Sequence, residues 1–187
     1  MTRPSSPDKA LTMHSLPRLG ELLPNNRFRD WWNSRPIPVP LFSGALLDFL
    51  VTVGTTEAGY PPDVVEAVDA FLSLGEADRL AASGRVCAYH REIVEQAERR
   101  GVADFLGIEP RSLKEPNDIW QFVTPTGVCV DRREDYDRDV YVTVACDCTW
   151  EPEHGLQLVY RRGGQLVRVS GQDGHLTDAN VKDLPGG

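Results

Sequence analysis

Residues 140–170, VYVTVACDCTWEPEHGLQLVYRRGGQLVRVS, carry the pattern that decides the fold. From Val140 to Cys148 every second position holds a valine or a cysteine, which is typical of a strand with one buried face. LQLVY and QLVRVS lie on either side of Gly163-Gly164, a dipeptide that favours a tight hairpin turn. The three segments therefore predict an antiparallel meander. The register that aligns its apolar residues pairs Tyr160 with Val167 and Leu158 with Val169.

Two helices are predicted upstream of the meander. Apolar spacing after Pro62 predicts a helix that ends near Gly75. A second helix is predicted from about Glu76 to Arg100, with Gly101 as its C-terminal stop. Between the helices and the meander, the segment DIWQFVTPTGVCVDRR predicts two strands around the turn TPTG.

The N-terminal part predicts less regular structure. Prolines interrupt residues 1–26, which we expect to be a flexible lead-in. Residues 27–187 are expected to form a single α+β domain, in which the antiparallel sheet packs against the two helices. Trp31 and Trp32 are neighbours and cannot both face one core, although packing of both against the folded body is the simplest interpretation.

The composition limits the possible partners. The net charge is −8 at pH 7, which argues against binding to a nucleic acid backbone. The arginine pairs at 132–133 and 161–162 are interpreted as solvated strand ends. We find neither an apolar run of membrane-spanning length nor a secretion signal, and the four cysteines are too scattered for a disulfide framework. A cytoplasmic protein with reduced thiols and no cofactor or membrane association is expected.

The meander predicts a candidate site at one end of the sheet. In an up-down-up order, the loop after Cys148 and the loop after Ser170 lie at the same end, so residues 149–155 and 171–178 should meet. The residues that we expect to form a binding surface there are Trp150, Glu151, Glu153, His154, Asp173, His175 and Asp178.

Several chemistries are compatible with this loop pair. Cys146, Cys148, His154 and His175 contain the atom types of a zinc site, but alternation with valines directs both thiols into the core. The carboxylates permit calcium, without the ligand spacing of a helix-loop-helix site. A hydrolase using His154 and His175, with or without metal, is the enzymatic alternative, and Cys148 with His154 or His175 would be its only nucleophile–base pair. Alternatively, the polar groups simply fix the loops.

A further pair of possible metal ligands lies on the second predicted helix. Cys87 and His90 are three residues apart, so both could contact one ion. With no further ligand nearby, we interpret them as a core thiol and a half-exposed histidine.

The sequence resembles a widespread bacterial domain of unknown function over roughly residues 36–180. Its marks are W-x-x-E-H-G-L and D-G-H-L-T followed by D or N. The matching residues are Trp150, Glu153, His154, Gly155, Leu156, Asp173, Gly174, His175, Leu176 and Thr177. The resemblance implies no established activity, cofactor or catalytic residue. Small acidic bacterial proteins of this kind often serve as immunity or accessory proteins of toxin systems, an expectation by analogy.

The favoured hypothesis is therefore a non-enzymatic protein-binding module. The acidic balance suits a basic protein partner, such as a toxin, and would speed the encounter. The enzymatic alternative predicts a concave pocket between the two loops, with both imidazoles facing solvent. A binding module instead predicts a flat or convex acidic or aromatic surface, with the histidines hydrogen-bonded to the backbone.

Overall fold

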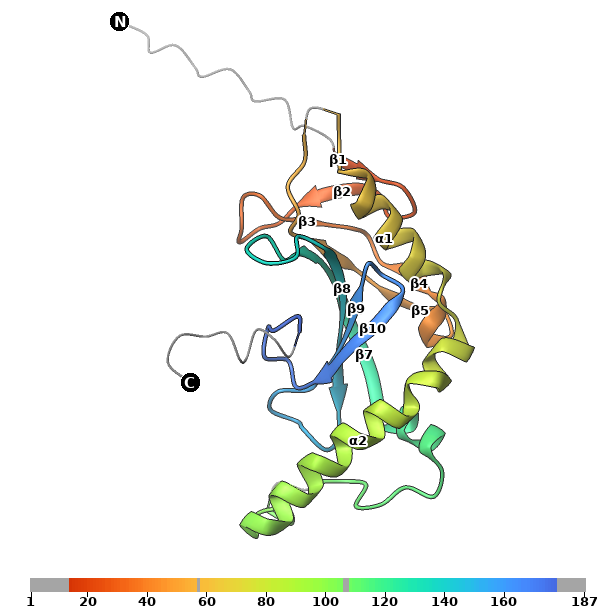
Figure 1. The fold of residues 1–187 in the computed structure, drawn as a ribbon, viewed down its shortest axis with the longest axis vertical. Coiled ribbons are helices and arrows are strands. Elements are labelled where there is room, and N and C mark those ends of the chain that lie inside the picture. Colours follow the sequence, from red (N-terminus) through yellow and green to blue (C-terminus); the bar gives the residue numbers. More distant parts are fainter. Residues whose placement is uncertain (1–13, 57, 106–107, 178–187) are drawn as a thin grey trace, which may run out of the picture.

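The computed structural model describes residues 14–56, 58–105 and 108–177. Its central feature is an eight-stranded sheet with the order β1-β2-β3-β6-β7-β8-β9-β10 (Figure 1). All neighbouring strands are antiparallel except β6 and β7, which are parallel. The strands of this sheet are β1 (His14–Leu16), β2 (Gly20–Pro24), β3 (Trp32–Asn33), β6 (Phe49–Val51), β7 (Val123–Arg132), β8 (Val140–Cys148), β9 (Leu156–Arg161) and β10 (Gln165–Ser170).

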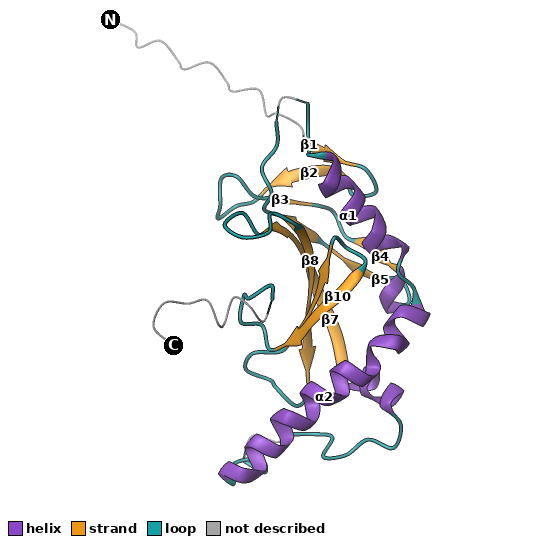
Figure 2. Ribbon diagram, viewed as in Figure 1, coloured by secondary structure: helices purple, strands orange, loops and turns teal. Residues whose placement is uncertain are grey.

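The remaining elements are helices and a small hairpin. The helices α1 (Pro62–Ser73) and α2 (Glu76–Arg100) lie on one side of the sheet (Figure 2). A separate hairpin joins β4 (Ile37–Val39) to β5 (Ala45–Leu47) through the short helix η1 (Pro40–Phe42), and η2 (Pro116–Phe122) precedes β7. The predicted α+β fold, with a mainly antiparallel sheet packed against two helices, is confirmed.

The C-terminal meander follows the predicted strand order. β8 pairs with β9, and β9 pairs with β10. The valines and cysteines that alternate along β8 are all buried, as expected for its inner face. Leu158 pairs with Val169 as predicted, but Tyr160 pairs with Leu166 rather than Val167. A β-bulge between Leu166 and Arg168 leaves the intervening residue unpaired and shifts the register by one position.

Apolar faces hold the helices against the sheet. In α1, Val64, Val68 and Phe71 are fully buried, and the Phe71 ring meets Tyr160 of β9 edge-on at 5.6 Å between centroids. Burying such side chains contributes roughly 2 kcal/mol each.

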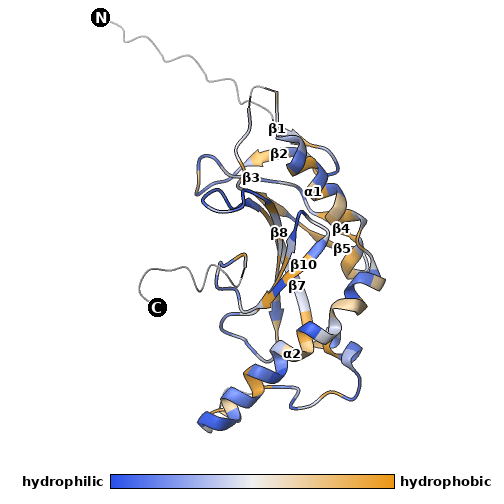
Figure 3. Ribbon diagram, viewed as in Figure 1, coloured by the Kyte–Doolittle hydropathy of each residue, from blue (hydrophilic) through white to orange (hydrophobic). Residues whose placement is uncertain are grey.

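α2 begins with Asp78 accepting a hydrogen bond from the Gly75 backbone N–H, and ends at Gly101 in the left-handed conformation. Its last turns are mostly hydrophilic (Figure 3), as befits the end that extends past the sheet.

α2 is also tied to the edge of the sheet. The Arg85 guanidinium donates to the carbonyl oxygens of Leu166 and Val167, at 2.5 and 2.7 Å. Because β10 is an edge strand of the sheet, these hydrogen bonds satisfy acceptors that a further strand would otherwise use.

The N-terminal segment differs from its prediction. His14–Leu16 and Gly20–Pro24 form a hairpin whose second strand joins the main sheet, so the expected lead-in up to residue 26 does not describe residues 14–24. Residues 1–13 lie outside the described residues. Leu16, Leu19 and Leu22 are buried in the same core as the meander, and this burial outweighs the disruptive effect of the prolines.

The segment before the meander also differs. Val123–Arg132 is one strand, whereas two strands around TPTG were predicted. A bulge between Pro125 and Gly127 accommodates the turn-forming residues within the strand, since Pro125 lacks the N–H that a regular ladder requires.

The two neighbouring tryptophans point in different directions. Trp32 packs against the core, whereas Trp31 stacks on Phe28 with ring centroids 4.0 Å apart.

Candidate binding site

The two loops predicted to meet are joined by hydrogen bonds. The backbone N–H of Gln172 donates to the carbonyl oxygen of His154 at 3.1 Å. The side-chain amide of Gln172 reaches further and donates to the carbonyl oxygen of Cys146 at 3.0 Å. The loop after β8 and the loop after β10 therefore lie side by side at one end of the meander.

Tight backbone geometry allows this contact. Gly155 has a φ of +62°, in the left-handed region. A Cβ added there would lie 2.5 Å from Nε2 of Gln172 and 2.6 Å from the carbonyl oxygen of Cys146. Glycine is therefore required at this position by both conformation and space.

A small hollow opens where the loops meet α2. We call it the loop hollow; it has a volume of about 240 Å³. Its lining residues are Tyr89, Glu151, His154, Gly171, Gln172 and Asp173. Among the predicted site residues, Glu151, His154 and Asp173 are thus brought together. The half-buried Tyr89 comes from α2, and burial raises the pKa of its phenol, so that it stays protonated and can donate a hydrogen bond.

His154 and Glu151 form the charged edge of the loop hollow. Nδ1 of His154 lies 2.8 Å from Oε1 of Glu151, and the imidazole is exposed. The hydrogen bond from His154 to Glu151 raises the pKa of the imidazole above 6.5, because it stabilises the protonated ring. The negative charge of Glu151 is therefore partly offset by His154, and the offset grows as the pH falls and more of the imidazole is protonated.

Asp173 organises the second loop. It accepts hydrogen bonds from both terminal nitrogens of Arg168, at 2.9 and 2.6 Å, and from the backbone N–H of His175 at 3.0 Å. Burial alone would raise the pKa of Asp173, but these donors outweigh it and lower the pKa. Gln157 and Arg168 also donate to the carbonyl oxygen of His175, at 3.0 and 2.8 Å. Asp173 thus fixes the loop at the same time as it lines the hollow.

The other predicted site residues occupy different positions. His175 is half-buried and does not line the loop hollow. Trp150 is fully buried rather than displayed on the surface, and its ring meets the His90 ring edge-on at 5.2 Å. Glu153 is exposed beside His154. Asp178 lies outside the described residues.

A second hollow, of about 250 Å³, adjoins the same loop and shares Glu151 and His154 with the loop hollow. It is lined by the C-terminal part of α2, by Val102 and Ile108, and by Trp150, Glu151, Glu153 and His154. The Nε1–H of Trp150 is buried and has no acceptor among the described residues. The loop from Trp150 to His154 therefore borders two hollows.

The cysteines are positioned as core residues. Cys146 and Cys148 are buried, and burial raises the pKa of Cys148 to about 12. A thiol with such a pKa remains protonated near neutral pH, which argues against Cys148 as an activated nucleophile. Within the described ranges, no group of three or more histidine, cysteine, aspartate or glutamate side chains is arranged to hold a metal ion.

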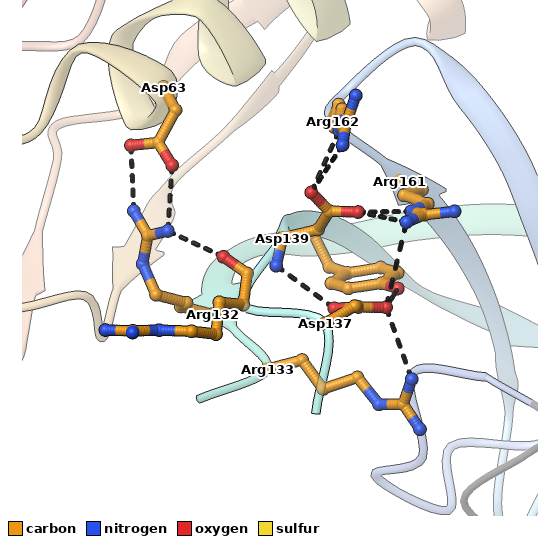
Figure 4. A network of polar contacts seen from close by, with 9 residues as sticks. Asp63, Arg132, Arg133, Asp137, Asp139, Arg161 and Arg162 are labelled. Carbon is orange, nitrogen blue, oxygen red and sulfur yellow. Dashed lines mark hydrogen bonds and ion pairs between the residues drawn. The ribbon is translucent and has the colours of Figure 1, made fainter. Parts of the chain in front are cut away.

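A network of arginines and aspartates occupies the opposite end of the meander (Figure 4). Asp63, in the first turn of α1, accepts two hydrogen bonds from Arg132, both at 2.8 Å. Asp139 is paired with both Arg161 and Arg162. The expectation of solvated arginine pairs is therefore wrong for Arg132 and Arg133, whose side chains are 14% and 10% exposed. Arg132 links β7 to α1 through Asp63.

The supporting residues of the site were not found from the sequence. Tyr89 lies within the second predicted helix without any mark of a site residue, and Gln157, Arg168 and Gln172 have no signal in a hydropathy pattern. The polar residues inside the otherwise apolar strands LQLVY and QLVRVS are the one available hint, since a polar group at such a position requires a partner. Gln157 and Arg168 are in fact buried.

Together these features define an α+β domain with a loop-built, largely acidic surface at one end of its sheet. The family model for a domain of unknown function, DUF6985, matches residues 18–176, and the chain belongs to this family. No curated protein and no solved structure matches the chain significantly. No helix among the described residues has the length and apolar content needed to cross a bilayer.

Proposed function

We propose that this chain is a non-enzymatic binding module that holds a basic protein partner on the loop surface formed by Glu151, Glu153, His154 and Asp173. By analogy with small acidic bacterial proteins, it would act in the cytoplasm as an immunity or accessory protein of a toxin system. The observation that carries the proposal is the joining of two distant loops around the loop hollow, which brings the carboxylates of Glu151 and Asp173 together beside His154, with Glu153 exposed next to it.

Shape and charge both support a partner of this kind. The hollow is small and open, which suits one projecting side chain better than an enclosed substrate, and only His154 of the two histidines lines it, whereas the enzymatic alternative requires both imidazoles there. A lysine or arginine side chain would meet the carboxylate of Glu151 and the side chain of Tyr89, both of which line the hollow. The net charge of −8 adds long-range attraction that speeds association with a basic partner.

The test begins with capture from cells of the organism that encodes the chain. The captured protein is identified by mass spectrometry, produced by itself, and titrated against wild type and against Glu151→Gln/Glu153→Gln. The variant should associate more slowly, and with a weaker dependence on salt, because mutation of charges at the rim of an interface acts mainly on the association rate.

A matched control removes the same charge elsewhere. Glu21→Gln/Glu66→Gln alters two exposed carboxylates on β2 and α1, away from the loops, and should leave association nearly unchanged. Equal slowing by both variants would show that only net charge matters. A partner that binds the loop variant as fast as wild type, or the absence of any reproducible partner, would refute the proposal.

A further inference from the structure

A separate cavity lies on the other side of α2, between this helix and the segment that leads to η2. It has a volume of about 470 Å³, and we call it the α2 cavity. Residues from the middle of α2 form one wall, including Cys87, His90 and Arg91, while Ser112, Leu113 and Lys114 contribute to the other. The volume lies within the range of pockets that bind small organic ligands.

The unpaired charges around the α2 cavity are mainly positive. Arg111 is engaged by Asp104 at 2.6 Å and by Glu98 at 3.9 Å, and Glu95 lies 3.7 Å from Arg99. No ion pair or hydrogen bond engages the side chains of Arg91 and Lys114 within the described part of the chain. The remaining lining carboxylate belongs to Glu115. The lining side chains carry three positive and three negative charges, so the wall is neutral overall in a protein whose net charge is −8, and among the described residues its two unpaired cations are Arg91 and Lys114.

A buried histidine adds a hydrogen-bonding group. His90 is only 4% exposed, and its Nε2 lies 2.7 Å from the carbonyl oxygen of Pro110. A carbonyl oxygen can only accept, so Nε2 carries the proton and, in the neutral ring, Nδ1 is an acceptor. Among the described residues no donor reaches Nδ1, while the imidazole lines the cavity. The site therefore combines two cations with one acceptor.

We propose that the α2 cavity binds a small hydroxycarboxylate. The carboxylate lies between Arg91 and Lys114, and the hydroxyl donates to Nδ1 of His90. A short aliphatic body contacts Val94 and Leu113, which also line the cavity. Because the lining charges balance, a monoanion brings less uncompensated charge into the cavity than a doubly charged phosphate and is favoured over it. This site is separate from the loop surface, and the inference does not depend on the proposed function.

The test uses α-hydroxyisocaproate, isocaproate and inorganic phosphate as probes. Binding to the full chain is measured by calorimetry and by the rate at which a maleimide modifies Cys87, with the labelled peptide identified by mass spectrometry. α-Hydroxyisocaproate should bind with a Kd of about 1 mM or tighter and slow the modification of Cys87. Isocaproate, which cannot donate to His90, and phosphate should both bind more weakly.

Two double variants separate the site from general electrostatics. Arg91→Gln/Lys114→Gln removes the carboxylate clamp and should weaken α-hydroxyisocaproate binding about tenfold or more, since each charge-assisted hydrogen bond contributes substantially. Arg29→Gln/Arg35→Gln changes net charge equally at exposed positions and should bind within about twofold of wild type. Binding by the clamp variant equal to wild type, tighter binding of phosphate, or neither heat nor protection at about 20 mM probe would overturn the proposal.

Discussion

Replacing Gly155 by alanine tests the contact between the two loops. The substitution forces a side chain into the left-handed region, which costs roughly 1–2 kcal/mol. The added Cβ would also lie 2.6 Å from the carbonyl oxygen of Cys146 and 2.5 Å from Nε2 of Gln172. These two atoms share a hydrogen bond, which must break or lengthen, at a further cost of about 1–2 kcal/mol. We therefore expect a total loss of about 2–4 kcal/mol in the free energy of unfolding.

Urea denaturation followed by circular dichroism measures this loss. Gly101→Ala is the matched control: its φ of +67° is almost the same, but nothing lies within 4 Å of the added Cβ. The control should lose only the backbone contribution of roughly 1–2 kcal/mol. The difference between the two variants isolates the contact between the loops. If both variants lose the same stability, the close approach of the loops is refuted.

Three further predictions concern other parts of the meander. Gly163→Ala should destabilise the protein by about 3 kcal/mol or more in urea denaturation, because the added Cβ would lie 1.8 Å from the backbone carbonyl oxygen of Ala67 in α1. Full retention of stability would contradict this packing. In an NMR titration the pKa of His154 should lie above 6.5 and should fall toward that value in Glu151→Gln. The ion pair therefore stabilises the fold below about pH 6.5, and this stabilisation is lost as the pH rises through the raised pKa of His154. An unchanged pKa in the variant would exclude the ion pair. Arg168→Met should lower the free energy of unfolding by about 2–4 kcal/mol near neutral pH. Because the pairing with Arg168 lowers the pKa of Asp173 in the folded state, the difference in stability from wild type should shrink as the pH falls through that pKa. A difference that persists in acid would assign the cost to packing alone.

The meander was predictable because its signal is local. Alternation along β8 and the glycines after β9 specify the strand directions, and the directions alone place both loops at one end of the sheet. The helices were predictable for the same reason, since α1 and α2 have regular apolar spacing and clear terminal residues.

The errors arose where tertiary contacts override local preference. Pro125 suggested a turn, but a bulge accommodates it within a long strand. The short strands β1 and β2 contain few residues and a proline, and they form because Leu16 and Leu22 are buried against the rest of the core. No periodicity over three to five residues could have revealed this.

The candidate site was only partly predictable. The composition of the loops identified Glu151, His154 and Asp173, but not the depth at which each side chain lies. Trp150 was expected on the surface because it lies in a polar loop, yet it is buried against His90. His90 itself was expected to be half-exposed and is buried, since η2 and the segment before it cover the middle of α2. Contacts between distant segments determined both outcomes.

Cross-linking measures the proximity of the two loops most directly. A Cβ built at Gly171 would lie 3.6 Å from Cβ of His154, within the range of a disulfide. Under mild oxidation, His154→Cys/Gly171→Cys should form an intramolecular disulfide, detected as a linked peptide by mass spectrometry. His154→Cys/Gly164→Cys, with the second cysteine in the hairpin at the far end of β10, should remain reduced. Failure of the first pair to join, or equal joining of both pairs, would contradict a shared surface built from the two loops.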